Sequence, residues 1–378
     1  MVDMTAKILL LQDAAYLPSF GGGNKANRLL IEALAALGFE CQVISRLPDE
    51  RRVLADRFGA VALIDRGLDV TVEDDGSLSY VHRGVDVTAV DTDAPATAAR
   101  IETKIASLQP DWILVSDDHR ALFLGPALQA ASDRTIILVH THWHLPFGPE
   151  ARASDPIQHD RMRRARGIVV VSDYSRRYLR DFGNLNADLI RFPVFGQGPF
   201  PVLGNPDIGH VTLINPCPSK GLAVFLDLAD HFADIAFAAV PTWGADDAVF
   251  AALAERPNIA VLSADDDIGT VLQGTRVLLA PSQIPETFGY VGVDAMLRGI
   301  PVMAGNLGGQ PEAKLGVDFV LPVGDTDDGS QRSGSDSELW RTALSTLLYD
   351  SAAYIRCAQA SRQAALRFLS ETDTQHFV

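Results

Sequence analysis

Residues 278–312 read LLAPSQIPETFGYVGVDAMLRGIPVMAGNLGGQPE, and this stretch says most about the fold. An apolar strand is expected at 277–280. It leads through a Pro-Ser loop to an acid, Glu286, which we expect to open a helix. A second strand at 300–304 ends in a Gly-Gly loop. This order of strand, helix and strand is typical of a parallel sheet.

Two acids are spaced along this stretch. In Glu286-x7-Asp294 the second acid follows two turns further on the same face of the expected helix. A carboxylate at a helix head accepts hydrogen bonds from sugar hydroxyls, and the free N–H groups beside it suit a diphosphate. The pattern therefore favours a site for a nucleotide sugar.

The whole string closely resembles the retaining glycosyltransferases of family 4. Their hallmark is Glu-x7-Glu, then a G-x-P-V strand and a GG-x-P-E loop. Here the parts are Glu286 and Asp294, then GIPV at 299–302 and GGQPE at 308–312. The resemblance implies that Glu286 contacts the donor sugar and Asp294 the ribose. The second acid departs from the pattern by one methylene, so altered ribose contacts are expected.

The same resemblance implies that the backbone amides of Phe288 and Gly289 meet the donor sugar or phosphates. It also implies an α/β fold of the GT-B type, in which two Rossmann-like domains face each other across a cleft. Strand and helix patterns alternate through the chain, as such domains require.

We expect an acceptor-side domain at 1–197 and a nucleotide-sugar-binding domain at 198–357. The Gly- and Pro-rich segment 192–207 is expected to connect them. The last helix, at about 358–378, is expected to pack back on the first domain, as in this fold. In the first domain, Asp75-Gly76 is expected to turn a hairpin inserted in the sheet.

A glycine loop precedes the first long helix. Gly21, Gly23 and Ala26 formally satisfy the dinucleotide fingerprint G-x-G-x-x-A. The long segment before them and the lack of an acid after the second strand argue against that reading. In family 4 a GG or GGG loop brings bare backbone to the donor phosphate and acceptor, which implies this role for Gly22 and Gly23. A purely structural glycine turn is the alternative.

Lys220 lies in INPCPSKG, residues 214–221, after the first strand of the second domain. A lysine there can neutralise a leaving diphosphate, as glycosyl transfer requires; a solvated surface lysine is the alternative. The family pattern has G-R before the loop that ends in K-G. Here Asn215 stands roughly where the arginine is usual, so one cation is missing or is supplied from elsewhere.

Three histidines alternate in VHTHWH at the end of a strand. His140, His142 and His144 share one face if the strand persists, and could then bind zinc. Family 4 enzymes carry a histidine near the donor sugar at this strand end, and setting T-V-H against the sequence points to His142. The loop at 116–120 is expected to bind acceptor or to cap a helix. Ser172 matches a family position but also suits a helix N-cap.

The bulk properties narrow the function further. The chain has 378 residues, a net charge of −16 and three widely spaced cysteines. The negative charge argues against nucleic acid or an anionic membrane as the main partner. The cysteine spacing argues against a disulfide framework and favours a cytoplasmic protein. We find no signal peptide and no apolar run long enough to span a membrane. RMRRAR at 161–166 reads as a basic helix end, with a membrane patch as the alternative.

Together these observations predict a cytoplasmic, metal-independent, retaining glycosyltransferase without a cofactor. It would move a sugar from a UDP- or GDP-type donor to a small soluble acceptor, with Glu286, Lys220 and His142 as catalytic residues. Two other classes stay open, a non-catalytic sugar-nucleotide-binding subunit and a nicotinamide-dependent oxidoreductase. The sequence does not determine the oligomeric state.

Overall fold

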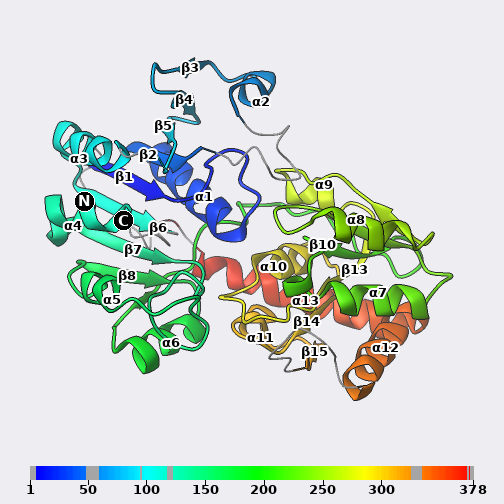
Figure 1. Cartoon of the computed structure of the whole chain (residues 1–378). Coiled ribbons are helices and arrows are strands. Elements are labelled where there is room, and N and C mark those ends of the chain that lie inside the picture. Colours follow the sequence, from blue (N-terminus) through cyan, green and yellow to red (C-terminus); the bar gives the residue numbers. More distant parts are fainter. Residues whose placement is uncertain are drawn as a thin grey trace. The chain divides into compact units, whose positions relative to one another are not determined.

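The computed structural model describes residues 6–47, 59–93, 96–116, 122–324, 334–372 and 374. The chain divides into two compact units, Met1–Val194 with Thr372–Val378, and Phe195–Glu371 (Figure 1). Each unit has its own β-sheet and its own hydrophobic core. The α/β fold with two Rossmann-like units is therefore confirmed.

The first unit alternates strands and helices. Its strands are β1 Lys7–Gln12, β2 Glu40–Arg46, β3 Val70–Val72, β4 Leu78–His82, β5 Val85–Val90, β6 Trp112–Ser116, β7 Thr135–Val139, β8 Gly167–Val170 and β9 Asp188–Leu189. Its helices are α1 Gly22–Ala36, α2 Gly59–Asp65, α3 Thr97–Leu108, α4 Leu124–Ala131, α5 Pro156–Met162 and α6 Asp173–Gly183, with the 3-10 helix η2 Ser132–Arg134.

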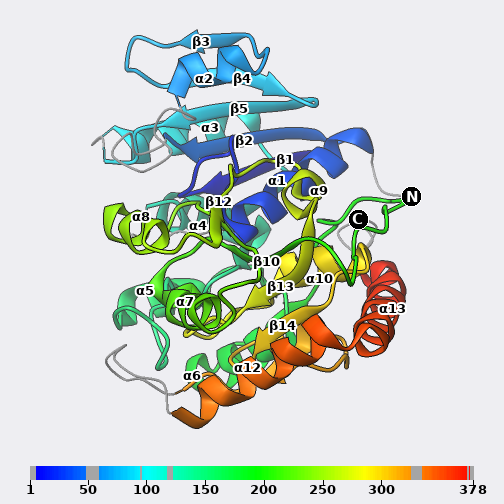
Figure 2. The ribbon, with the colours of Figure 1, turned by 90° about the vertical axis from the view of Figure 1, so that its right-hand side faces the viewer.

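The strands of the first unit form one sheet in the order β3-β4-β5-β2-β1-β6-β7-β8-β9. Pairing is parallel from β5 to β9, and the central strand β1 is almost wholly buried, as its run of Leu and Ile requires. β3 and β4 form the expected antiparallel hairpin, with Gly76 in the turn at a φ of +80°. Figure 2 shows this hairpin at one edge of the sheet.

The second unit follows the same alternation. Its strands are β10 His210–Ile214, β11 Phe237–Val240, β12 Ile259–Val261, β13 Thr275–Ala280, β14 Val302–Gly305 and β15 Val320–Leu321. Its helices are α7 Leu222–His231, α8 Asp247–Ala254, α9 Ile268–Leu272, α10 Tyr290–Leu297, α11 Gln310–Ala313, α12 Gly334–Tyr349 and α13 Ser351–Phe368, with the 3-10 helices η3 Pro218–Lys220 and η4 Leu369–Glu371.

These strands form a parallel sheet in the order β12-β11-β10-β13-β14-β15. The loops that leave β10 and β13 at their carboxyl ends are therefore neighbours. The last long helix, α13, packs on α10 and α12 of this unit, and its Tyr354 hydroxyl donates to the carbonyl of Arg276, 2.8 Å away. Residues after Glu371 group with the first unit, and the packing of a C-terminal helix on that unit stays a prediction.

Candidate active site

The carboxyl edge of the second sheet brings two of the predicted catalytic residues together. Lys220 ends η3 after β10, and its ammonium donates to the carboxylate of Glu286 in the loop after β13. Ser282 donates its hydroxyl to the same carboxylate oxygen. The Lys220 and Glu286 side chains are 24% and 20% exposed, so the pair is open to solvent. Parallel α/β sheets bind their ligands at this edge.

Glu286 does not open a helix, which corrects the expectation from the sequence. Helix α10 begins at Tyr290, after Gly289 with a φ of +121°, a backbone conformation that favours glycine. Glu286 instead lies in an extended segment that bridges to Gly308, and its carbonyl accepts from the amide of Gly309 at 2.6 Å. The Gly-Gly loop therefore holds the backbone of Glu286 through this hydrogen bond.

A side chain on Gly308 or Gly309 would destroy this contact. A Cβ at Gly308 would lie 2.4 Å from the carbonyl oxygen of Glu286, and one at Gly309 would lie 2.3 Å from that of Thr287. Only glycine allows the two backbone segments to approach this closely. The GGQPE pattern, part of the family hallmark, thus has a structural reason.

Asp294 lies inside α10 and not on a helix shared with Glu286. The residue is 7% exposed, and its carboxylate is 3.2 Å from Nη1 of Arg298, which also donates to the Asp294 carbonyl. This i, i+4 ion pair is almost wholly buried. The geometry gives Asp294 a structural partner at the C-cap of α10, and ribose contact stays a prediction.

Phe288 contributes to the core with its side chain. It is 1% exposed and stacks on Phe368, with 5.6 Å between the ring centroids. Only its backbone is therefore suited to the role that the sequence suggested. A Cβ at the adjacent Gly289 would be in ordinary van der Waals contact with Ala313, 3.6 Å away.

Asn215, which stands roughly where the family arginine is usual, holds a neighbouring loop. Its φ of +60° is left-handed, a conformation that Asn tolerates better than most residues. Its side-chain oxygen accepts from the amide of Gly244 at 2.9 Å. Its side-chain nitrogen is buried and has no hydrogen-bond partner among the described residues. The Gly244 loop and Ser282 are parts of this site that the sequence analysis missed.

In the first unit, the glycine loop packs on a histidine at the end of β7. A Cβ at Gly23 would lie 2.5 Å from the Cβ of His140, so α1 can approach the strand end only with glycine there. Gly22 is the first residue of the same helix. Nε2 of His140 is 2.7 Å from the side-chain oxygen of Asn27. Burial lowers the pKa of His140 to about 3, which keeps the imidazole neutral.

His142, the histidine predicted to lie near the reacting carbon, is engaged elsewhere. It is 3% exposed, with Nδ1 at 2.8 Å from Glu150 and Nε2 at 2.9 Å from the Ser175 hydroxyl. Its ring stacks on Tyr178 at a centroid distance of 4.1 Å. Both ring nitrogens therefore have partners inside the unit, and a role for His142 at the donor sugar stays a prediction. Ser172 caps α6 and accepts from the Ser175 amide at 3.0 Å.

The histidines also do not share a strand face, because β7 ends at Val139, before all three. Within the described residues, no group of three or more His, Cys, Asp or Glu side chains could hold a metal ion. Of the predicted acceptor loop at 116–120, only Ser116 lies within the described residues.

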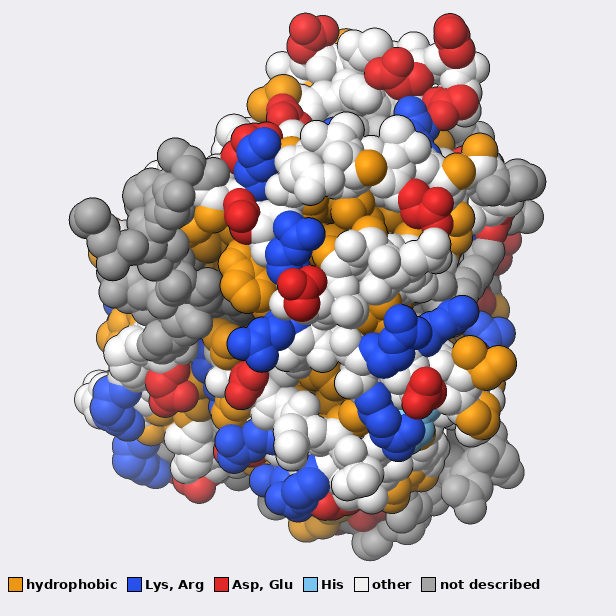
Figure 3. Space-filling view, turned by 90° about the vertical axis from the view of Figure 1, so that its left-hand side faces the viewer, with side chains coloured by type: hydrophobic (Ala, Val, Ile, Leu, Met, Phe, Trp, Pro, Cys, Tyr) orange, Lys and Arg blue, Asp and Glu red, His pale blue; other side chains and the backbone are white. Residues whose placement is uncertain are grey.

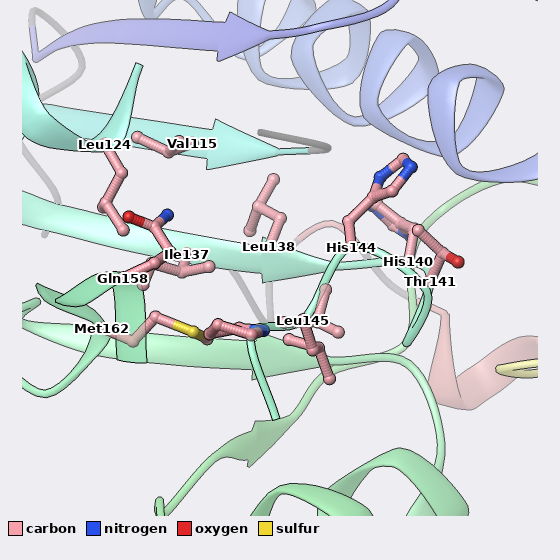
Figure 4. A pocket seen from close by; sticks show the side chains of 12 residues that line it. Val115, Leu124, Ile137, Leu138, His140, Thr141, His144, Leu145, Gln158 and Met162 are labelled. Carbon is pink, nitrogen blue, oxygen red and sulfur yellow. The ribbon is translucent and has the colours of Figure 1, made fainter. Parts of the chain in front are cut away.

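A small, mostly apolar cavity of about 50 Å³ lies beside His140 in the first unit. Figure 4 shows His140, Thr141 and His144 at one end of it and Gln158 and Met162 at the other. A water molecule needs roughly 10–15 Å³ by this measure, so the cavity suits a few small groups and not a sugar ring.

The arginines of RMRRAR lie where α5 ends. The helix stops at Met162, and Arg161 is in its last turn. On the face drawn in Figure 3, Lys and Arg side chains are spread with Asp and Glu among them. Among the described helices, none is both long and apolar enough to cross a membrane.

Two family models match the chain, one in each of its two compact units. Residues 20–192 match the model described as Glycosyltransferase Family 4, and residues 205–332 match the one described as Glycosyl transferases group 1. A stretch of 103 residues, 27% of this chain, is 31% identical to D-inositol 3-phosphate glycosyltransferase from Corynebacterium efficiens. That match spans only 22% of the relative's length.

Solved structures share the fold over nearly the whole chain. Sucrose-phosphate synthase from Thermosynechococcus elongatus superposes with a TM-score of 0.70 at 16% identity, over 97% of this chain and 96% of that one. HepE from Anabaena, solved with UDP and glucose, gives 0.67 at 17% identity, over 98% and 96%. Each unit therefore matches a glycosyltransferase model, and the chain has the GT-B fold that these solved structures share.

Proposed function

We propose that the protein is a retaining glycosyltransferase that moves a sugar from a nucleotide diphosphate donor to a small soluble acceptor. The observation that carries this proposal is the joining of Lys220, Glu286 and Ser282 at the carboxyl edge of the second sheet. A cation for phosphate and a carboxylate for sugar hydroxyls stand side by side there, supported by the Gly308–Gly309 backbone.

The Lys220–Glu286 ion pair holds both charges ready before a donor arrives. When a donor binds, its diphosphate takes the ammonium of Lys220 and its sugar hydroxyls donate to Glu286. Phe288 and Gly289 follow Glu286 by two and three residues, and their amides are proposed to bind the sugar or phosphates. Fixed charges of this kind stabilise a leaving diphosphate without reorganising in the reaction.

The transfer itself needs no protein base. The acceptor oxygen attacks the anomeric carbon on the face that the diphosphate leaves. The leaving phosphate oxygen takes the acceptor proton as the old bond breaks. The chain's part is to orient the two substrates and to exclude water. Lys220 supplies the cation, so we propose a metal-independent reaction with no cofactor. We also propose a UDP- or GDP-type donor; HepE was solved with UDP and glucose.

In the first unit, we propose that the neutral His140, and not His142, serves the donor sugar. His140 adjoins Gly23, whereas the nitrogens of His142 are held by Glu150 and Ser175. The backbone of Gly22 and Gly23 is proposed to approach the donor phosphate and acceptor. The net charge of −16 supports a small soluble acceptor, without nucleic acid or a membrane, and the three free cysteines support a cytoplasmic location.

The test is Glu286→Gln with a saturating donor. Loss of the charge removes an orientation contact that strengthens in the transition state, so kcat is expected to fall on the order of a hundredfold or more. The matched control is Glu255→Gln, at an exposed carboxylate after α8. Equal turnover in both variants would overturn the assignment of Glu286. Donor binding by the wild type without turnover on any acceptor would favour a non-catalytic subunit.

A further inference from the structure

An exposed tryptophan stands beside the proposed phosphate-binding lysine. Trp243 follows β11, the strand next to β10, and its side chain is 46% exposed. Nζ of Lys220 lies over the indole, 6.0 Å from its centroid. Thus the carboxyl edge that holds the Lys220–Glu286 pair also carries a large flat apolar surface.

The loop that carries Trp243 is held in place from two sides. The amide of Gly244 donates to the side-chain oxygen of Asn215, and a Cβ at Gly244 would lie 2.8 Å from the sulfur of Cys217. On the other side, Asp246 caps α8 by accepting from the Val249 amide at 2.9 Å. A rigid loop keeps an exposed ring in one place at little cost in conformational entropy on binding.

Two buried polar groups next to Trp243 lack partners. Asn215 and Thr242 are each 6% exposed. The side-chain nitrogen of Asn215 and the hydroxyl of Thr242 have no hydrogen-bond partner among the described residues. Buried polar groups are nearly always paired, so a water molecule or a polar ligand is expected to complete these two.

We propose that the indole of Trp243 stacks on the nucleobase of the donor. The inference rests on the proposed function, because it requires Lys220 to hold the diphosphate. Offset aromatic rings stack with centroids about 4.5–7 Å apart. The ammonium is 6.0 Å from the indole centroid, so one nucleotide can reach both groups, with its base on a face of the indole and its phosphates at Lys220. The ribose then lies near Asn215 and Thr242.

Stacking is tolerant of base identity, because every nucleobase has a flat π face. Trp243 is therefore a source of affinity common to all bases, and the choice among bases lies elsewhere. If Trp243 only positioned Lys220, its loss would weaken the binding of the phosphates instead. These two roles differ in what a ligand without a base would show.

The experiment is calorimetric titration of the full chain with UDP, GDP, ADP and inorganic pyrophosphate. Trp243→Ala is expected to weaken the nucleotides that bind the wild type by about five- to hundredfold. Pyrophosphate affinity is expected to stay within about twofold, which also shows that the site is folded. Trp243→Phe keeps a flat ring and should recover most of the loss. The control is Trp112→Ala, an exposed tryptophan at the amino end of β6, which should change nothing.

Three outcomes overturn the proposal. Unchanged nucleotide affinity in Trp243→Ala removes stacking and leaves the proposed glycosyl transfer standing. An equal loss for pyrophosphate and nucleotides makes Trp243 a support for Lys220 alone. If the wild type binds none of the three nucleotides, both this inference and the proposed donor site fail.

Discussion

Lys220 and Glu286 are 66 residues apart in the chain, and the fold joins them as an ion pair. The sequence indicated each residue separately, from its loop and its resemblance to family 4. It could not show that each is the other's partner, because the contact depends on β10 and β13 being neighbours. The linear sequence pattern does not determine that strand order.

Lys220→Ala should weaken nucleoside diphosphate binding far more than nucleoside binding, because the lysine is proposed to contact only phosphate. A charge-assisted hydrogen bond in a cleft is worth roughly 1.5–3 kcal/mol. Calorimetry with UDP and uridine, or with GDP and guanosine, measures the difference. Equal losses for the diphosphate and its nucleoside would rule out this role.

Asp294 is the acid for which the sequence and the structure differ most. Its pairing with Arg298 predicts that Asp294→Asn lowers the free energy of unfolding by about 2 kcal/mol or more, because a buried guanidinium loses its charge partner. The control, Asp230→Asn, breaks an exposed pair with Arg256 and should cost about 1 kcal/mol or less. Unchanged stability together with a raised donor KM would return Asp294 to the ribose.

The histidines show why alternation alone misplaces a side chain. His140, His142 and His144 share a face only in a continuing strand, but β7 ends at Val139. Beyond that point each imidazole follows the turn, and His142 becomes buried against Tyr178. The end of a strand depends on its neighbours in the sheet, which a single sequence does not report.

At the scale of elements, most strands and long helices follow from hydrophobic period. The strand expected at 277–280 lies within β13, and the one expected at 300–304 overlaps β14. The prediction that this helix opens at Glu286 was wrong, because α10 begins at Tyr290. The helix signal at Glu286 was overridden by a long-range contact, the bridge between Glu286 and Gly308.

Lys314 after α11 offers a test of packing at this scale. It is 2% exposed, and its ammonium donates to the carbonyl of Val302 at 2.6 Å. Burial lowers its pKa to about 8, below the value of about 10.4 for a free lysine. Below about pH 8 both folded and unfolded chains are protonated, and the full cost of the buried charge is present. Between the two values the unfolded chain binds more protons, so this cost falls as pH rises.

The stability of the wild type relative to Lys314→Met is therefore expected to rise by roughly 2 kcal/mol from about pH 7 to about pH 10. Denaturant unfolding of both proteins at the two pH values measures it. Lys104→Met, at a partly exposed lysine on α3, is the control and should show little pH-dependent difference. A flat difference for Lys314→Met would mean that the lysine is solvated in the folded state.

At the scale of the whole molecule, the alternation of strands and helices was enough to predict two α/β units. The division falls between Val194 and Phe195, inside the Gly- and Pro-rich segment 192–207. Which loops meet within each unit was beyond the sequence, as the Trp243 loop shows. That loop was not singled out from the sequence, and the order of β11 and β10 places it beside Lys220.

The measurement that tests the central claim most directly is proton NMR of sugar transfer with EDTA present. The full chain is incubated with UDP- and GDP-linked α-sugars and a panel of small soluble acceptors. We expect the anomeric signal of one donor to decline and a product signal of the same α configuration to replace it. Product of inverted configuration, transfer that stops with EDTA and returns with a metal ion, or no transfer from any donor would contradict the account.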